Sequence, residues 1–559
     1  MGYWKSSLIS FAIIGACFCE EEIGRNHILY LTRQEKIPEA IDAYFKLKTK
    51  NEKHDSEILS QIAEIILERN MHSRVEEKEL LTLYGASIAG TKSLLDFCEI
   101  GAKSPHPKTQ LVSIQLAGQI PDDGVDPILC KAFSSNYFPI RMEAASYMAM
   151  RKYKYSVGYI ESLMTKIHPV YHYFFSQMFA QIGTPEAMII LKKMIHSGEL
   201  FTRIAATLAA AEARRDDLLK DIRAAATHLN PAEQEACAFA LGLLGDSSSC
   251  ELLEKLSLSF ENEVALSAAR SLAILGKKEF IKNIVKKAQA NDLFAISMLG
   301  SMDGMQDLLH NLCKEKDKQL RFNAFFSLLV SKDLRAIKEA PQFLISDYHD
   351  LAFIPTYSTG RTMMYWKALP SLSVLSKTEQ GEGLLAISLA IREQILTHCF
   401  DLDHQEFLLL ADLIIKKEQK DLIPLLMELL CNIKSEKVID FLKNKAEELG
   451  KPFTRYYACL ALAKMKVQGP YFERIKKWIL DEKKRVLIEF NPVTSKTMTD
   501  TSFNYKLTPK ENSSLLIESL MMLCSFQEEK SLDLLLDIIK NGNPKNHPIL
   551  AGLLIKALE

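Results

Sequence analysis

Residues 230–260 read NPAEQEACAFALGLLGDSSSCELLEKLSLSF and contain two helical patterns separated by a turn. Pro231 suits the first turn of a helix, and apolar residues at helical spacing follow it as far as residue 243. Gly245 ends this first helix, because glycine readily adopts the left-handed conformation that closes many helices. A second helix is expected over 250–258. The unit is therefore a helix, a tight turn and a second helix.

This unit repeats every 31 residues between residues 113 and 289, and three columns of residues keep their character at that spacing. The small column is Gly118, Ala149, Ala180, Ala211, Gly242 and Ala273. The apolar column is Leu129, Ile160, Leu191, Ile222, Leu253 and Ile284. The third column, small except at one position, is Ser113, Ala144, Phe175, Ala206, Cys237 and Ala268. A fixed period of this length predicts a solenoid whose units bury their apolar faces by stacking, with small residues where helix backbones approach closely.

The run ACAFALGLLGD at 236–246 resembles the core signature of HEAT repeats, particularly the short bacterial type found in phycobilisome lyase subunits. Residues 268–276 and 141–145 carry weaker versions, and the resemblance covers about one third of the chain. It implies an all-α fold, a superhelical solenoid of stacked antiparallel helix pairs that serves as a scaffold or docking surface. It implies no reaction, because the motif is a packing motif without a catalytic residue.

The rest of the chain is less regular, and the period shortens beyond residue 289. Residues 20–101 are predicted to be a helical cap, since the first core face of a solenoid must be covered. The expected domains are a signal at 1–19, the cap at 20–101, a HEAT-like solenoid at 102–345, an aromatic-rich insertion at 346–380, and C-terminal helical repeats at 381–559 with a second insertion at 486–508.

The N-terminus has the order of a secretory signal: Lys5, an apolar run over 8–19, and three glutamates at 20–22. The apolar run is too short to span a bilayer as a stable anchor. Ile14-Gly15-Ala16-Cys17 also resembles a bacterial lipoprotein box, which makes Cys17 a lipidation candidate and implies a membrane tether, with ordinary cleavage after Ala16 or Cys19 as the alternative. We expect an exported protein, periplasmic or envelope-associated in a bacterium. If this segment is instead a buried helix, the protein is cytoplasmic.

Composition is that of a large globular body, with 48% hydrophobic and 25% charged residues. The formal net charge is −1, so no global field gathers nucleic acid, and no nucleic-acid partner is expected. The chain has 11 cysteines without a CxxC pair, a pattern that suggests neither a disulfide framework nor a zinc ribbon. Free thiols are unusual in an oxidising compartment, which conflicts with export.

The first break in the helical pattern, over 346–376, is rich in aromatic residues. Tyr357, Arg361, Tyr365 and Trp366 are of the residue types that are enriched at binding hot spots. A long segment of this kind inside a repetitive body is often functional. The alternative is that its aromatic side chains fill the joint between two halves of the solenoid.

The second break contains two strand-like runs, at 486–490 and 501–507, around a turn rich in threonine and serine. These runs predict a β-hairpin. Its edge either pairs with a partner strand or covers a groove.

One column of the repeats is basic: Lys131, Lys193, Lys255 and Lys286 follow the apolar column by two residues in four of six units. Stacking would align these lysines on one face, which in HEAT-like solenoids often lines the concave groove. This predicts a binding surface, and the alternative is an ordinary solvated helix face.

No motif for a serine hydrolase, zinc protease, P-loop or dinucleotide fold is present. The cluster HCFDLDH at 398–404 gathers metal-ligand types, but it reads better as an interhelical turn in which Asp401 or Asp403 caps the next helix. We therefore expect no catalytic residue, metal or cofactor, and a non-catalytic scaffold that binds other proteins. A HEAT-like enzyme of the lyase or DNA-glycosylase type and a lipid-anchored structural envelope protein are the alternatives. The sequence leaves the partner and the oligomeric state open.

Overall fold

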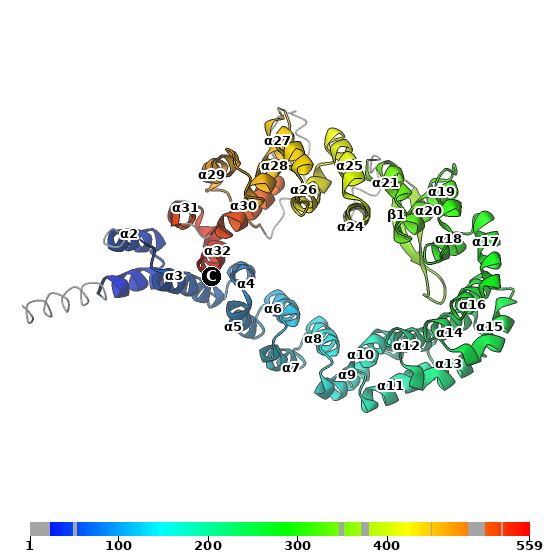
Figure 1. The fold of residues 1–559 in the computed structure, drawn as a ribbon. Helices are drawn as coiled ribbons and strands as arrows, with labels where there is room; N and C mark the ends of the chain where they lie inside the picture. The colour runs from blue at the N-terminus through cyan, green and yellow to red at the C-terminus, as the bar shows by residue number, and fades with distance from the viewer. Residues whose placement is uncertain are drawn as a thin grey trace, which may run out of the picture. The chain divides into compact units, whose positions relative to one another are not determined.

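The computed structural model describes residues 23–48, 53–345, 351–370, 379–448, 450–489, 509–526 and 529–559. The described part of the chain is an all-α solenoid of HEAT-like helix pairs with one small antiparallel sheet (Figure 1). It divides into two compact units, unit 1 over 1–148 with 439–559, and unit 2 over 149–438. The predicted signal and Cys17 lie outside the described residues.

Unit 1 combines the two ends of the chain. A helix over 23–33 comes first. The next helices are α2 (Ile37–Lys48), α3 (Ser56–Met71), α4 (Glu76–Ala89), α5 (Thr91–Gly101), α6 (Pro107–Gln119), α7 (Asp126–Ala132) and α8 (Phe138–Met150). The C-terminal helices are α27 (Glu436–Glu447), α28 (Pro452–Lys464), α29 (Tyr471–Glu482), α30 (Pro509–Cys524), α31 (Glu529–Asn541) and α32 (His547–Leu558).

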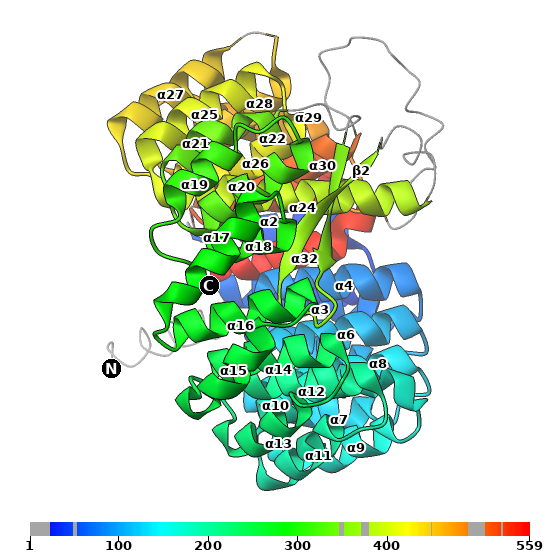
Figure 2. The same ribbon diagram turned by 90° about the vertical axis from the view of Figure 1, so that its right-hand side faces the viewer.

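Unit 2 contains the central helix pairs and the sheet (Figure 2). Its first part has α9 (Val157–Met164), the 3₁₀ helix η3 (Pro169–Phe175), α10 (Ser176–Ile182), α11 (Pro185–Ile195), α12 (Leu200–Glu212), α13 (Leu219–Ala225), α14 (Pro231–Leu243), α15 (Cys250–Ser257), α16 (Asn262–Ile274) and α17 (Ile281–Gln289). Its second part has α18 (Leu293–Leu299), α19 (Gln306–Leu312), α20 (Lys318–Val330), α21 (Arg335–Glu339), α22 (Pro341–Leu344), strands β1 (Leu351–Tyr357) and β2 (Met364–Pro370), α24 (Glu379–Leu402), α25 (His404–Lys416) and α26 (Ile423–Cys431).

The 31-residue period of the sequence is the period of the helix pairs. The first helices of successive pairs begin at residues 107, 138, 169, 200, 231, 262 and 293, each 31 after the one before. The next first helix, α20, begins at residue 318, only 25 residues later. The predicted shortening of the period after residue 289 is therefore confirmed.

The predicted columns form the core of the stack. All six members of the apolar column and all six of the third column have a relative exposure of 0%. Burying one leucine or isoleucine side chain contributes about 1.5–3 kcal/mol, so each repeat adds a similar increment of stability.

Glycines in the small column stand where neighbouring first helices touch. A Cβ atom on Gly118 would overlap the ring of Tyr147, and a Cβ atom on Gly242 would overlap the side chain of Ser271. Each of these neighbours lies on the next first helix. The hydroxyl of Ser271 uses the close approach to donate a 2.7 Å hydrogen bond to the carbonyl oxygen of Ala238 on α14. The small column is thus the line along which first helices contact one another.

Within unit 1, the C-terminal helix α32 packs against α3 and α4. Gly85 of α4 and Gly552 of α32 face each other so closely that a Cβ atom on either would overlap the backbone of the other helix. Residues 467 positions apart in the sequence thus form one core, and the N-terminal helices are not closed by their own sequence neighbours alone.

The described strands form a hairpin inside the aromatic insertion. Strand β1 pairs with β2 in antiparallel register, from Leu351 opposite Pro370 to Tyr357 opposite Met364. This is not where the sequence predicted a hairpin. Of the predicted one, residues 486–489 form no strand, and residues 490–508 lie outside the described residues. Among the described helices, none is both long and apolar enough to cross a bilayer.

Candidate functional site

The hairpin is fixed at its base by aromatic packing against α20. Trp366 of β2 is only 5% exposed, and its ring centroid lies 5.6 Å from that of Phe322 and 5.1 Å from that of Phe326. On the other strand, the ring of Phe353 stacks on Phe322 at 3.9 Å. One aromatic residue of α20 therefore receives a ring from each strand.

The outer edge of β2 is paired by side chains of α20 rather than by a third strand. The amide of Asn323 donates to the carbonyl oxygen of Trp366 and accepts from its N–H, both at 2.8 Å. The side-chain oxygen of Gln319 accepts from the N–H of Ala368, also at 2.8 Å. These bonds satisfy backbone groups that a free edge would leave open.

The turn of the hairpin is held by two glutamates on the first helices α14 and α16. Glu235 accepts from the N–H of Gly360 at 2.7 Å and from the hydroxyl of Thr362. Glu263 accepts from the N–H of Thr359 at 2.9 Å and from its hydroxyl at 2.5 Å. Only glycine fits at 360, because a Cβ atom there would lie 2.6 Å from the carbonyl oxygen of Ala232.

Burial sets the electrostatics of this contact. Glu235 has a relative exposure of 0%. Its desolvation raises the pKa of the carboxyl, and the nearby charge of Glu263 raises it further, whereas the hydrogen bonds from the turn oppose the rise.

Next to this anchor, the turn presents an arginine against two aromatic rings. The guanidinium of Arg361 lies 5.3 Å from the ring centroid of Phe201 and 5.5 Å from that of Tyr173. The rings of Tyr173 and Phe174 are 4.1 Å apart. Arg361 has a φ of 56°, a left-handed conformation that non-glycine residues rarely adopt and that often marks functional sites.

We call these four residues, Tyr173, Phe174, Phe201 and Arg361, the tip patch. Phe174 is 50% exposed and Phe201 is 48% exposed, and Arg361 is also exposed. Large aromatic side chains and arginine are the residue types that carry most binding energy at protein interfaces. In Figure 1 the hairpin runs beside α20 and α18 with its turn toward α16 and α14.

The candidate residues of the insertion have different environments. Trp366 belongs to the interior, and Tyr365 is half-buried, with a pKa that burial raises. Tyr357, at the end of β1, is 59% exposed. The base of the insertion therefore packs against α20 and its turn carries an exposed arginine, while binding by the insertion stays a prediction.

The lysine column lies on the second helices of the repeats, whereas the hairpin contacts the first helices. Its members are on second helices, with Lys131 on α7 in unit 1 and Lys193, Lys255 and Lys286 on α11, α15 and α17 in unit 2. All four are exposed. The hairpin contacts described above involve first helices, so these lysines do not take part in the tip patch.

Sequence reasoning missed the receiving side of the site, although one signal was present. Glu235 occupies a position of the first helix that is Ile204 one repeat earlier and Leu266 one repeat later, and both of these are buried. A glutamate in a buried column indicates a partner that satisfies it. For Tyr173, Phe174 and Phe201, no pattern in the sequence distinguished exposed rings from core rings.

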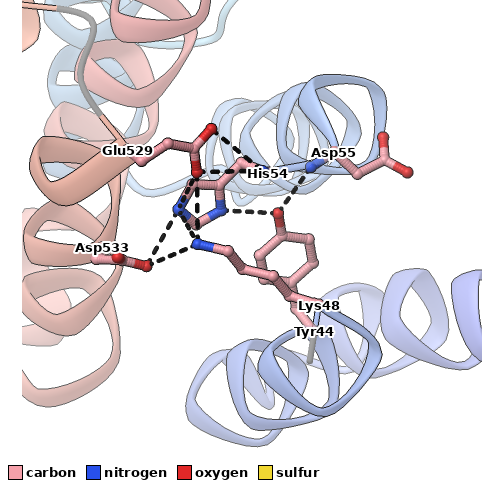
Figure 3. Close-up of polar contacts among 6 residues, drawn as sticks. All are labelled: Tyr44, Lys48, His54, Asp55, Glu529 and Asp533. Atoms are coloured by element: carbon pink, nitrogen blue, oxygen red, sulfur yellow. Dashed lines mark hydrogen bonds and ion pairs between the residues drawn. The ribbon is translucent and has the colours of Figure 1, made fainter. Parts of the chain in front are cut away.

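A second polar cluster, in unit 1, joins α2 and the start of α3 to α31 (Figure 3). The ammonium of Lys48 lies 3.1 Å from Asp533 and 3.5 Å from Glu529. The imidazole of His54 contacts Lys48 at 2.8 Å, Asp533 at 3.1 Å and the hydroxyl of Tyr44 at 2.9 Å. We call this set the terminal ion cluster.

Burial dominates the titration of the terminal ion cluster. It raises the pKa of Tyr44 to about 12. It also lowers the pKa of His54, as does the adjacent charge of Lys48, while Glu529 and Asp533 act in the opposite direction. The lowered pKa favours a neutral His54 at neutral pH, and its contacts connect residues of α2 and α31, from the two ends of the chain.

The predicted interhelical turn at 398–404 is shorter than expected: residues 398–402 are the last turn of α24, and only Asp403 separates α24 from α25. Asp403 caps α25, its carboxylate accepting from the N–H groups of Gln405 and Glu406 at 2.8 Å, and Cys399 is buried. Capping by Asp403 is thus confirmed. In the described part of the chain, no group of three or more histidine, cysteine, aspartate or glutamate side chains is placed to hold a metal ion.

Comparison with known proteins finds similar folds only. No family model and no curated protein matches the chain. Among solved structures, the complex of CpcE and CpcF of phycocyanin lyase from Nostoc is 14% identical, with a TM-score of 0.27, over 45% of this chain and 94% of that one. Kap121p is 12% identical, with a TM-score of 0.31, over 94% of this chain and 78% of that one. Kap95 in its complex with Nup1 is 10% identical, with a TM-score of 0.30, over 90% of this chain and 69% of that one. At these TM-scores the likeness carries no information about ligand or activity.

Proposed function

We propose that this protein is a non-catalytic scaffold that binds a partner protein through the tip patch of unit 2. The observation that carries the proposal is an exposed arginine and three aromatic rings, held in place by a hairpin turn that two glutamates anchor. Three of these side chains come from the repeats and one from the insertion, so the patch forms only when the hairpin is docked.

Preorganisation favours binding at this patch over binding at other exposed apolar residues. A side chain that is already held against its neighbours loses less conformational freedom on association. Arg361 is held by two rings and by a turn whose neighbours are hydrogen-bonded on both sides. By contrast, Leu258 and Phe260, which are 82% and 107% exposed, lie in or beside the loop after α15.

Affinity capture with matched variants tests the proposal. The double variant Phe174→Ser with Phe201→Ser removes two half-exposed rings, and the control Leu258→Ser with Phe260→Ser removes two more exposed apolar side chains. We expect the first variant to lose a partner that the wild type and the control retain, because truncation of a hot-spot residue costs about 2 kcal/mol or more, roughly 30-fold in affinity. Equal thermal unfolding of the two variants confirms that folding is unaffected. If both variants retain the same partners as the wild type, the tip patch is not the binding site.

The proposal includes export, which the order of residues 5–22 supports. Mass determination of the mature N-terminus tests it. A chain that begins after residue 16 or 19 supports export, and a lipidated Cys17 supports the envelope-anchored alternative. A chain that begins at residue 1 or 2 would place the protein in the cytoplasm.

A further inference from the structure

The hydroxyl of Thr359 lies between two carboxylates. Its oxygen is 2.5 Å from Oε2 of Glu263 and 3.1 Å from Oε2 of Glu235, both within hydrogen-bond distance. The same Oε2 of Glu235 accepts from the N–H of Gly360. The other oxygen of Glu235 accepts from the hydroxyl of Thr362. Two acidic groups from adjacent first helices therefore meet at one threonine.

A count of hydrogens shows what this geometry requires. A threonine hydroxyl has one hydrogen to donate, and an ionised carboxylate has none. If both glutamates are ionised, the single hydrogen of the Thr359 hydroxyl is shared between two carboxylates, and the two like charges repel each other. If Glu235 carries a proton on Oε2, that proton is donated to the Thr359 oxygen, and the Thr359 hydroxyl donates to Glu263. Every contact of the turn is then satisfied.

Glu235 is the group that takes the proton. It is fully buried, whereas Glu263 is only partly buried, so the energetic cost of a charge is larger at Glu235. Glu263 on α16 is the charged group that acts on Glu235, Tyr365 on β2 lies near Glu235, Glu263 and Asp292, and Arg361 belongs to the same turn. Two of these are acids, and Arg361 is directed at Tyr173 and Phe201. The raised pKa of Glu235 agrees with this assignment.

We propose that the hairpin turn is a proton-linked latch, which docks on α14 and α16 with uptake of one proton shared by Glu235, Thr359 and Glu263. Docking is strongest below the ordinary pKa of a glutamate and weakens as the pH rises toward the raised pKa of docked Glu235. Above that pKa it stays constant. One proton changes the docking equilibrium by at most tenfold per pH unit. Because the docked turn positions Arg361, the latch regulates the tip patch; this consequence rests on the proposed function, whereas the latch itself does not.

Hydrogen exchange in the free, full-length chain tests the latch without any partner. The readout is the protection factor of the amides of Thr359 and Gly360 from about pH 4.5, the ordinary pKa of a glutamate, to about pH 8.5, corrected for intrinsic exchange. In the wild type we expect protection to fall as the pH rises, by up to tenfold per unit. Glu235→Gln should remove the dependence on pH, since an amide supplies a hydrogen without titrating. Glu251→Gln, an exposed position on α15, should behave as the wild type.

Glu263→Gln provides a second test that does not depend on how well Glu235→Gln folds. Its side chain is uncharged, so it no longer adds to the raised pKa of Glu235, whereas the burial of Glu235 still does. Protection in this variant should therefore fall with pH over a narrower and lower range than in the wild type. Protection that is independent of pH in the wild type would overturn the latch. So would the same dependence of protection on pH in the wild type and in both glutamine variants. Because the exchange experiment contains no partner, its failure would overturn the latch but not the proposed binding at the tip patch. Affinity capture tests that binding separately.

Discussion

Gly242 and Gly158 are both helical glycines, yet their surroundings predict opposite effects of a methyl group. At Gly242 of α14 a Cβ atom would overlap Ser271 of α16, whereas Gly158 of α9 has no atom within 4 Å of that position. Gly242→Ala should therefore destabilise the protein by about 1–3 kcal/mol through overpacking. Gly158→Ala should stabilise it by about 0.4–1 kcal/mol, because alanine reduces the freedom of the unfolded chain. Urea unfolding of the two variants measures both effects, and equal midpoints would contradict the assignment of the small column to helix contacts.

His54 gives a prediction in which the sign depends on pH. Its pKa is lowered in the folded state, so the unfolded chain binds more protons as the pH falls below about 6.5. The contribution of neutral His54 to stability is present above that pH and is lost as the pH falls through the window down to the folded pKa. We expect the free energy of unfolding of the wild type to exceed that of His54→Asn by more at pH 7.5 than at pH 5.5. A difference that grows at the lower pH would show that Glu529 and Asp533 dominate instead.

For single residues, the sequence predicts which side chains pack in the core better than it predicts which polar side chains form a site. All twelve members of the apolar and third columns are fully buried, because a strict period forces the same environment on every repeat. Glu235 is an exception, because it is a glutamate at a buried position that is apolar in the neighbouring repeats. Its hydrogen-bond partners lie 124 to 127 residues further along the chain. No local pattern specifies a contact over such a distance.

Among the elements, the hairpin shows why an insertion is harder to predict than a repeat. The segment 351–370 is rich in aromatic and β-branched residues, which favours strands. However, it contains Pro355, and its apolar and polar residues do not alternate as they do in a typical half-buried strand. Its strands are stabilised by α20, through Asn323, Gln319 and the ring of Phe322. The structure of the insertion thus depends on a helix that precedes it by some 30 residues.

The role of Asn323 predicts a specific loss. Asn323→Leu keeps the side chain similar in size but makes it apolar, which leaves the buried N–H and carbonyl of Trp366 without partners, at a cost of about 1–3 kcal/mol for each group. We expect a red shift of tryptophan emission that is absent when Trp366→Phe is added. Asn283→Leu, on the exposed face of α17, serves as the control. An unchanged spectrum in Asn323→Leu would mean that the hairpin does not depend on this pairing.

At the scale of the whole molecule, unit 1 is built from two separate stretches of the sequence. The 31-residue repeat did not reveal this. The helices α3 and α4 share a core with α32, and Lys48 of α2 pairs with Asp533 of α31. The sequence predicted a cap over residues 20–101, but a contact between the two ends of a chain leaves no trace in a repeat pattern. The close approach of Gly85 and Gly552 marks where α4 and α32 meet.

This organisation predicts that damage to one terminus affects the other. Gly552→Val in α32 should push α32 away from α4, because two methyl groups cannot fit against the backbone at Gly85. Hydrogen exchange should show reduced protection in α3 and α4 and unchanged protection in α12 and α14 of unit 2. Equal loss of protection in both units would indicate that the chain unfolds as one body, and no loss in α3 and α4 would contradict the shared core.

The central claim, that the tip patch is a protein-binding site, is tested most directly by site-specific photocrosslinking in the source cell. A photoreactive phenylalanine analogue replaces Phe201 in one chain and Phe260 in another, both of them exposed ring positions in unit 2. We predict a discrete adduct with another protein from position 201 and none from position 260. No adduct from position 201, or the same adduct from both positions, would contradict the claim.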